Sequence, residues 1–335
     1  MLFDFKKVEF ETVKCITCNS DKNLVKLFSA PDRLNKLPGA FYLVKCKKCG
    51  LVFQNPRPTE KYIKYYYPES TGYFNSSETK QSKLSAFMEK EILVNFYNYN
   101  NLGRKNIVKK VLFCPIYIYF FKHQSIPQHK KDGTLLEIGC SNGIRLKKLK
   151  DIGWKIKGIE PSSKASEIAR IKRNLDVETG SIFDFDFPEK SFDAIILDMA
   201  LEHLYNPDIA IQKISKWIKP GGQLIFSIPY FNGIEYKLFK EYSYGLQLPT
   251  HITFFNKESI FYFLKDNFNK IKIIFHHFDR DVVASAGYKY QDTHRIFYRF
   301  ISSNKAFRFI IIKPLVYILS IFKKTSRVTV FAIKK

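Results

Sequence analysis

The segment that most constrains this chain is an apolar stretch that ends in a carboxylate and a glycine-bounded turn. It reads Leu135-Leu136-Glu137-Ile138-Gly139-Cys140-Ser141-Asn142-Gly143, and an apolar pattern of helical period follows it. A strand, a glycine turn and a helix in this order build a nucleotide-type pocket at the carboxyl end of a parallel strand. Gly139 and Gly143 let a ligand lie directly against the backbone, because no Cβ is in the way. The spacing differs from the G-x-G-x-x-G of dinucleotide-binding enzymes.

Further blocks follow downstream. Residues 155–160 read as a second strand ending in Glu160, where a carboxylate can accept hydrogen bonds from both ribose hydroxyls. Residues 192–198 read as a fourth strand, and Leu201-Glu202-His203-Leu204 comes shortly after it. A helix over 206–218 should stop at Lys219-Pro220-Gly221-Gly222, before a strand over 223–229.

These four blocks, in register across residues 134–229, resemble class I S-adenosylmethionine-dependent methyltransferases. Motif I of that family is usually Glu/Asp-x-Gly-x-Gly-x-Gly, and Ser141 stands where the middle glycine is usual. The resemblance implies an α/β fold with a Rossmann-like seven-stranded core and S-adenosylmethionine as the methyl donor. It also implies that the last two strands, over 270–275 and 327–333, form an antiparallel hairpin at one edge.

The resemblance assigns donor binding to residues around the turn and the strand ends. Glu137 would orient the turn and the methionyl amino group, Glu160 would take the ribose hydroxyls, and Ser181 with Ile182 would flank the adenine. Cys140 is expected to border the donor or simply to pack, and not to be a nucleophile. The full set is Glu137, Gly139, Cys140, Gly143, Glu160, Ser181, Ile182, Asp198 and Met199.

The candidate catalytic residues are Glu202, His203 and His251. His203 follows the fourth strand, and His251 lies in a Pro-x-His-x-x-x-Phe block that related proteins also carry. Histidine can accept a hydroxyl or amine proton near pH 7. The alternative for His203 is a structural hydrogen bond that ties a helix to a loop, and either histidine could instead be a satisfied core residue.

Four of the six cysteines form two CxxC units, Cys15 with Cys18 and Cys46 with Cys49. Without an export signal, this spacing indicates a tetrahedral structural zinc site, with a redox role as the alternative. The exit Gly50-Leu51-Val52-Phe53-x-Asn55-Pro56-Arg57-Pro58 and a Tyr-Tyr-Pro segment resemble a zinc-ribbon subgroup of methyltransferases. That subgroup is associated with sugar, polysaccharide or secondary-metabolite modification.

The predicted organisation is a zinc ribbon over 10–60, a helical linker or lid over 61–130, and a methyltransferase core over 131–335. A helical insertion over 279–326 interrupts the core, and residues 79–110 read as mostly helical. The apolar run over 307–322 is too short and too interrupted by charge to span a bilayer. It should pack on this protein or a partner chain, or lie on an anionic membrane through residues 295–322.

The formal net charge of +24 favours an anionic partner or surface, unless the charge is simply spread over solvated faces. We therefore expect a cytoplasmic methyltransferase that acts on a small molecule or a glycan precursor, with peripheral contact at the inner membrane face as an open alternative. The alternatives are an RNA methyltransferase that grips nucleic acid with its ribbon, and a cofactor-binding protein without catalysis. The acceptor, the methylated atom and the oligomeric state do not follow from the sequence.

Overall fold

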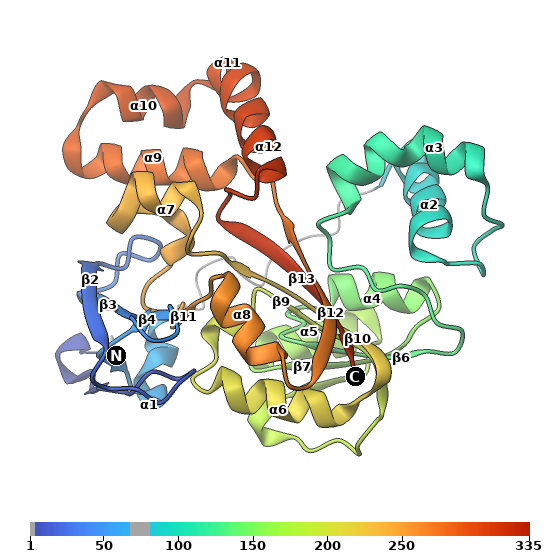
Figure 1. The fold of residues 1–335 in the computed structure, drawn as a ribbon, viewed down its shortest axis with the longest axis horizontal. Helices are drawn as coiled ribbons and strands as arrows, with labels where there is room; N and C mark the ends of the chain where they lie inside the picture. The colour runs from blue at the N-terminus through green and yellow to red at the C-terminus, as the bar shows by residue number, and fades with distance from the viewer. Residues whose placement is uncertain (1–3, 68–80) are drawn as a thin grey trace.

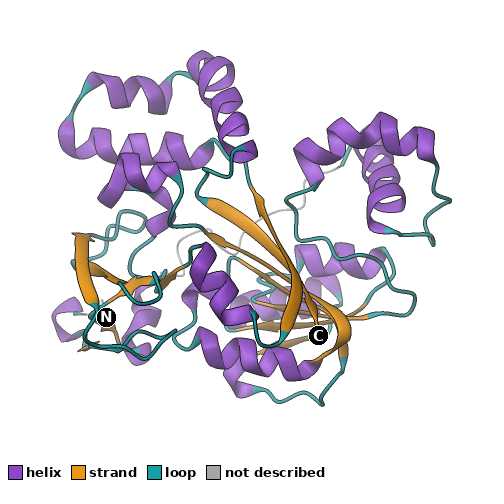
Figure 2. Cartoon of the chain, viewed as in Figure 1, coloured by secondary structure: helices purple, strands orange, loops and turns teal. Residues whose placement is uncertain are grey.

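A seven-stranded mixed sheet forms the centre of the computed structural model, which describes residues 4–67 and 81–335 (Figures 1 and 2). The strand order is β12-β13-β10-β9-β6-β7-β8. The strands are β6 (Thr134–Ile138), β7 (Lys155–Glu160), β8 (Val177–Thr179), β9 (Phe192–Asp198), β10 (Ile218–Pro229), β12 (Phe268–Phe275) and β13 (Arg327–Lys334).

The chain reverses its direction of travel across the sheet at β6. It adds β7 and β8 in parallel on one side of β6, then β9 and β10 in parallel on the other. Ligands bind at such a switch point, beyond the carboxyl ends of the strands. β13 is antiparallel to both β10 and β12, so the predicted edge hairpin and the predicted Rossmann-like methyltransferase fold are confirmed.

Helices cover both faces of the sheet, so its central strands are buried on both sides. β6 and β9 are buried almost throughout and mostly apolar, as expected of parallel strands between two helical layers. One face packs against α6 (Pro207–Trp217) and α8 (Lys257–Leu264). The other packs against α4 (Ile144–Asp151), α5 (Ser163–Arg173) and α2 (Lys83–Tyr97).

The ribbon is built on a four-stranded antiparallel sheet of order β11-β4-β3-β2. Its strands are β2 (Leu24–Ala30), β3 (Phe41–Cys46), β4 (Val52–Gln54) and β11 (Thr253–Phe254), while β1 (Phe10–Glu11) pairs with β5 (Arg57–Pro58). The fourth strand, β11, comes from the methyltransferase core. Thr253 pairs with Phe53 and Phe254 with Val52, so the ribbon and the core share one sheet.

Two helical lobes rise from the same end of the molecule, above the sheet in Figure 1. The α2–α3 lobe (residues 83–121) contains α2, α3 (Ile107–Ile116) and one π-helical turn, Tyr117–Phe121. The insertion lobe (residues 280–321) lies between β12 and β13 in the chain. It contains α9 (Arg280–Thr293), α10 (Ile296–Ser303), α11 (Lys305–Phe307), a π-helical turn (Arg308–Ile312) and α12 (Lys313–Ile321).

The helical stretch predicted over 79–110 proves to be two helices. Asn98 ends α2 in a left-handed conformation with φ of 65°, and the side chain of Asn106 caps α3 by accepting from the Lys109 amide. Asparagine suits both positions, because it tolerates positive φ and competes well as an N-cap. Residues 79 and 80 lie outside the described residues, as does part of the predicted linker, residues 68–80.

Candidate active site

The turn after β6 depends on residues with positive φ. Gly139 has φ of 73° and Gly143 has φ of 80°. A Cβ on Gly143 would lie 2.6 Å from Leu175 Cδ1, so glycine is needed for packing as well as for conformation. Ser141, in place of the usual middle glycine, has φ of 50°. That conformation costs a non-glycine residue roughly 1–2 kcal/mol. Ser141 nevertheless adopts it, so the backbone of the turn keeps the positive φ that a glycine would have at this position.

Glu160 fixes this turn from the next strand. Its Oε2 accepts a hydrogen bond from the Ser141 amide at 2.8 Å, and its Oε1 accepts one from the Ser162 amide at 2.9 Å. The residue is only 7% exposed, and burial raises its pKa. Each carboxylate oxygen has a second lone pair. Glu160 can therefore brace the turn and still accept hydrogen bonds from a ribose.

Arg145 joins two acids at the same edge of the sheet. It lies in the first turn of α4, forms a salt bridge with Asp198, and its Nη1 is 3.6 Å from Glu137 Oε1. Burial raises the pKa of Glu137 to about 7, although Arg145 opposes this shift. The sequence reasoning did not select Arg145. Its place two residues after Gly143, on the helix that opens the pocket, was the available signal.

A cavity of about 630 Å³ opens beside Arg145 and Asp198, a size usual for small-molecule sites. Both helical lobes and the β12–β13 region contribute to its walls. Among its lining residues are Tyr119, His123, Ser125, Met199, Ser227, His276, His277, Phe278, Lys313 and Arg327.

Three predicted donor-side residues are engaged in packing or capping. Cys140 is 5% exposed, and burial raises the pKa of its thiol, which agrees with a packed and unreactive side chain. Ile182 is 1% exposed and belongs to the core. Ser181 caps a short helix by accepting from the Phe183 amide at 3.3 Å. Their proposed contacts with the donor stay predictions.

The structure brings Glu202, His203 and His251 together, and we call them the acceptor cluster. His251 Nε2 is 4.0 Å from Glu202 Oε1, and the two imidazole rings are 4.7 Å apart. His203 Nδ1 lies 2.8 Å from the Thr250 carbonyl oxygen, and His251 Nδ1 lies 2.9 Å from that of Gly245. The Tyr67 hydroxyl is also 2.9 Å from His203 Nδ1.

Burial determines the protonation of this cluster. It lowers the pKa of His203 to about 4 and that of His251 well below its usual value. It raises the pKa of Glu202 to about 8. Both imidazoles are therefore neutral at pH 7, and each retains a nitrogen lone pair for a proton or a metal ion.

The ribbon holds the loop that carries His251. The Gln54 side-chain amide donates to the carbonyl oxygens of Pro249 and His251, at 2.7 Å and 2.6 Å. Arg57, in the ribbon's exit, donates to the Tyr205 carbonyl at 3.0 Å and stacks on its ring at 4.5 Å. Because Tyr205 follows His203 closely, the ribbon contacts both histidine-bearing segments.

The four ribbon cysteines form a donor set that fits zinc. Their Sγ atoms all lie within 4.8 Å of one another, with 3.4 Å between Cys15 and Cys49 and 3.5 Å between Cys18 and Cys46. These distances are far too long for disulfides. A tetrahedral site with Zn–S bonds of about 2.3 Å places sulfurs about 3.8 Å apart. The hydrogen bond between Cys15 and Cys49 lowers the pKa of Cys15 and raises that of Cys49.

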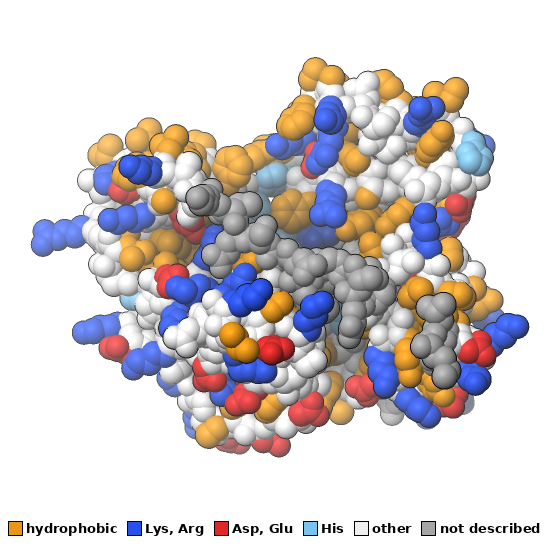
Figure 3. Space-filling model, turned by 180° about the vertical axis from the view of Figure 1, so that it is seen from behind, with side chains coloured by type: hydrophobic (Ala, Val, Ile, Leu, Met, Phe, Trp, Pro, Cys, Tyr) orange, Lys and Arg blue, Asp and Glu red, His pale blue; other side chains and the backbone are white. Residues whose placement is uncertain are grey.

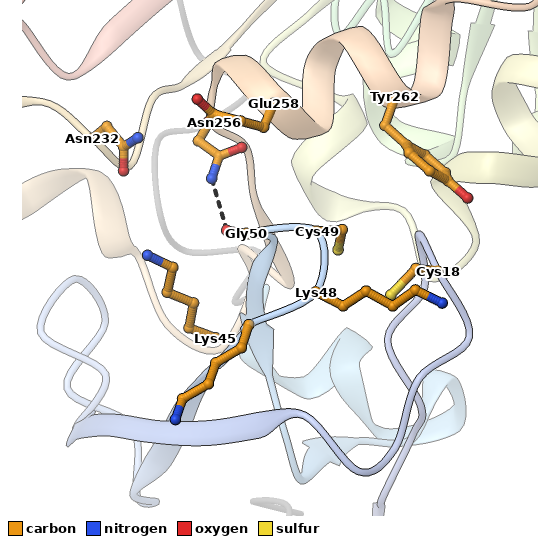
Figure 4. Close-up of a pocket in the computed structure, with 10 residues that line it drawn as sticks. Cys18, Lys45, Lys48, Cys49, Gly50, Asn232, Asn256, Glu258 and Tyr262 are labelled. Carbon is orange, nitrogen blue, oxygen red and sulfur yellow. Dashed lines mark hydrogen bonds between the residues drawn. The ribbon is translucent and has the colours of Figure 1, made fainter.

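A separate hollow of about 620 Å³ lies beside Cys18 and Cys49 (Figure 4). Lysines of the ribbon line one side and Asn256 and Tyr262 the other. The Asn256 side-chain amide donates to the Gly50 carbonyl at 2.7 Å across it. This hydrogen bond is a further link between the ribbon and the start of α8.

Residues 114–267 match the model of a family described as "Methyltransferase domain". An uncharacterized methyltransferase of Anoxybacillus flavithermus is 33% identical over 101 residues, which cover 29% of this chain and 48% of the relative. A ubiquinone biosynthesis O-methyltransferase of Thiobacillus denitrificans is 29% identical over 110 residues, or 31% of this chain and 47% of the relative. The chain thus spans about half the length of the curated relatives it matches.

A solved S-adenosylmethionine-dependent methyltransferase from Thermotoga maritima, described as a possible histamine N-methyltransferase, is 23% identical. The similarity covers 62% of this chain and 84% of that one, with a TM-score of 0.41. Residues 114–267 therefore match a methyltransferase domain, and the strand order agrees with the predicted class I fold. This match agrees with the predicted enzyme class over residues 114–267.

One zinc ion per chain should be bound by Cys15, Cys18, Cys46 and Cys49. Cys46→Ser should abolish this metal content and also speed amide hydrogen exchange over residues 250–255, because β11 depends on β4 for its pairing. Elemental analysis and hydrogen-exchange mass spectrometry would measure the two effects. Cys114→Ser is the matched control and should change neither. Unchanged metal content in Cys46→Ser would contradict the assignment.

The pH dependence of stability should reveal the buried Glu137 carboxyl. Its pKa is about 7 in the folded protein, against a usual value of 4.5, so the folded state holds this proton more tightly. The resulting stabilisation is complete below pH 4.5 and is lost as the pH rises through 7. Relative to Glu137→Gln, the wild type should lose up to about 3 kcal/mol between these limits. Urea unfolding at several pH values would test this, and a constant difference between the two proteins would refute it.

Proposed function

We propose that this chain transfers a methyl group from S-adenosylmethionine to a small molecule or a glycan precursor. The observation that carries the proposal is the meeting of Glu137, Glu160 and Asp198 around a positive-φ turn, next to a cavity of about 630 Å³. In this arrangement the donor would lie across the carboxyl ends of β6, β7 and β9. The predicted donor residues come from those ends and the segments that follow them, except for Ser181 and Ile182, which follow β8.

Each group at this edge has chemistry that suits part of the donor. Glu160 would accept hydrogen bonds from the ribose hydroxyls. Glu137 would accept charge-assisted hydrogen bonds from the amino group of the methionyl part, and Arg145 would donate such bonds to its carboxylate. The bound donor supplies an electrophilic methyl group on a sulfonium. The protein's further task is to exclude water and to activate the acceptor, which we assign to the acceptor cluster.

The relative from Thiobacillus denitrificans is named as an O-methyltransferase of ubiquinone biosynthesis. This favours a small-molecule acceptor over RNA, whose methylation was the alternative. The sugar and polysaccharide subgroup supports a glycan precursor and rests on the ribbon and its exit sequence. The ribbon also contacts the core directly, since the side chains of Gln54 and Arg57 donate hydrogen bonds to carbonyl oxygens of the core. These side chains are therefore not available to bind nucleic acid.

The two lobes carry the most exposed apolar surface of the described residues. On α3, Ile107, Val108, Val111 and Leu112 are each at least 68% exposed. In the insertion lobe and its exit, Ile296, Phe297, Phe309, Ile310, Ile321 and Phe322 are each at least 60% exposed. The lobe's own small core buries only Ala286, Ile301, Ile312 and Val316 within residues 280–322. Such a surface marks an interaction site.

The charges of these segments favour an anionic membrane as the partner. Residues 104–122 hold five lysines and arginines and residues 295–324 hold seven, and neither segment contains an aspartate or glutamate. Figure 3 shows hydrophobic side chains along the upper edge of both lobes, with lysines and arginines among them. Apolar side chains inserted at the bilayer surface with cations near anionic headgroups are typical of peripheral binding. Among the described residues, no helix is long and apolar enough to cross a bilayer.

The cavity lies between these two lobes, since Tyr119 and Lys313 are both among its lining residues. A protein docked through both lobes would present this cavity to the bilayer. We therefore propose an enzyme at the cytoplasmic face of a membrane, with a lipid-linked glycan as one acceptor class that fits.

Donor binding tests the core of this proposal. Calorimetry should detect one S-adenosylhomocysteine per chain, and Glu160→Gln should weaken binding by about 1–3 kcal/mol through lost ribose hydrogen bonds. Glu178→Gln is the matched control, because Glu178 lies on the neighbouring strand β8 and its side chain is 49% exposed. It should bind the ligand as the wild type does. An intact protein that binds neither S-adenosylmethionine nor S-adenosylhomocysteine would overturn the proposal.

Vesicle flotation tests the membrane surface. The full chain should float with vesicles that contain phosphatidylglycerol at low salt, and less with pure phosphatidylcholine or at high salt. Val108→Ser with Leu112→Ser, and Ile310→Ser with Phe322→Ser, should each reduce binding by about tenfold. Ile171→Ser with Ile209→Ser is the control pair, since these exposed residues lie on α5 and α6. Equal losses in all three pairs, or no flotation of the wild type, would contradict the proposal.

A further inference from the structure

Two imidazoles and one carboxylate meet at the acceptor cluster, apart from the four thiolates of the ribbon. We infer that Glu202, His203 and His251 bind a divalent transition-metal ion, at a site distinct from the zinc site of the ribbon. The inference deepens the proposed function, on which only the catalytic role of the metal depends.

The donor atoms are already close. One ring nitrogen from each histidine and one Glu202 oxygen lie within 4.8 Å of one another, and His251 Nε2 is 4.0 Å from Glu202 Oε1. Ligands about 2.0–2.2 Å from a shared ion can be up to about 4.4 Å apart. Small movements of the side chains would therefore complete the coordination.

Both histidines are oriented as metal ligands usually are. The Thr250 and Gly245 carbonyl oxygens can only accept, so the nitrogens facing them, His203 Nδ1 and His251 Nδ1, carry the protons. Each Nε2 is then the atom with the available lone pair. A ligating histidine typically donates its other ring N–H to a carbonyl or carboxylate, which fixes its tautomer and direction.

Glu202 lacks the partners that a buried carboxylate needs. It is fully buried, and neither of its side-chain oxygens has a hydrogen-bond partner within the part of the chain that the structure describes. Its backbone is fixed, since the Glu202 carbonyl accepts from the Ile252 amide at 2.8 Å. A buried carboxyl without hydrogen-bond partners is unfavourable, and a cation between Glu202 and the two histidines would displace its proton and pair with the carboxylate.

The donor set selects the class of metal. Two imidazoles and one carboxylate suit zinc, iron, cobalt and related divalent ions, whereas calcium and magnesium prefer oxygen ligands only. Three protein ligands leave coordination positions open, as in catalytic sites. The metal would bind an acceptor hydroxyl and lower its pKa, so that the proton leaves to water. The oxygen then forms a bond to the donor methyl carbon while the S–C bond breaks and its electron pair stays on sulfur.

Cobalt(II) titration of the zinc-loaded full chain tests the inference. Calorimetry and visible absorption should show one bound Co²⁺ with the weak bands of nitrogen and oxygen ligands, without the intense charge-transfer bands of thiolates. Glu202→Gln and His251→Asn should each weaken Co²⁺ binding at least tenfold. Glu235→Gln is the matched control, because Glu235 is another buried carboxyl with one oxygen that lacks a hydrogen-bond partner among the described residues. It should bind Co²⁺ as the wild type does.

Thermal melting of the same samples guards against variants that fail to fold. Co²⁺ should raise the Tm of the wild type and of Glu235→Gln, and leave that of the two cluster variants unchanged. A wild type that does not bind Co²⁺, or cluster variants that bind it normally, would overturn the inference. S-adenosylhomocysteine binding, measured in parallel, separates this failure from a failure of the proposed methyl transfer.

Discussion

The pairing of β11 with β4 places a strand of the core inside the sheet of the four-cysteine ribbon. The loop before β11 carries His251, and Gln54 of the ribbon holds two carbonyl oxygens of that loop. The position of His251 relative to Glu202 therefore depends on the ribbon, a small module for which we predict a stabilising zinc ion. On this account the ribbon is a support for the acceptor side of the active site, and the zinc ion acts on catalysis only through structure.

The donor side depends on a different constraint, the carboxyl edge of the parallel strands. Local sequence determines most of it, because the strand, the turn and the helix that follow one another in the chain are also neighbours in space. For this reason the glycine turn, Glu160 and the strands from β6 to β10 could be predicted from sequence, as could the antiparallel edge hairpin. The clustering of the four cysteines was equally predictable, since two CxxC pairs are a spacing typical of metal ligands.

Contacts between distant segments could not be predicted in this way. Nothing near Gln54 indicates that its amide will reach Pro249, and the helical period of α4 does not reveal that Arg145 will join Asp198. Two placements were open for the apolar run over 307–322, packing on protein or lying on a membrane. Its sequence does not indicate how much of its apolar surface the rest of the chain covers. The division of the helix predicted over 79–110 was readable in principle, because Asn98 and Asn106 are typical end and start residues.

The central claim is that the donor edge and the acceptor cluster face one another across a single site. A crystal structure of the full chain with S-adenosylhomocysteine tests it most directly. The account predicts the ribose against Glu160, the methionyl group beside Glu137 and Arg145, and the sulfur directed toward Glu202, His203 and His251. A ligand bound at this edge with its sulfur directed away from these three residues, or bound elsewhere on the protein, would contradict the account.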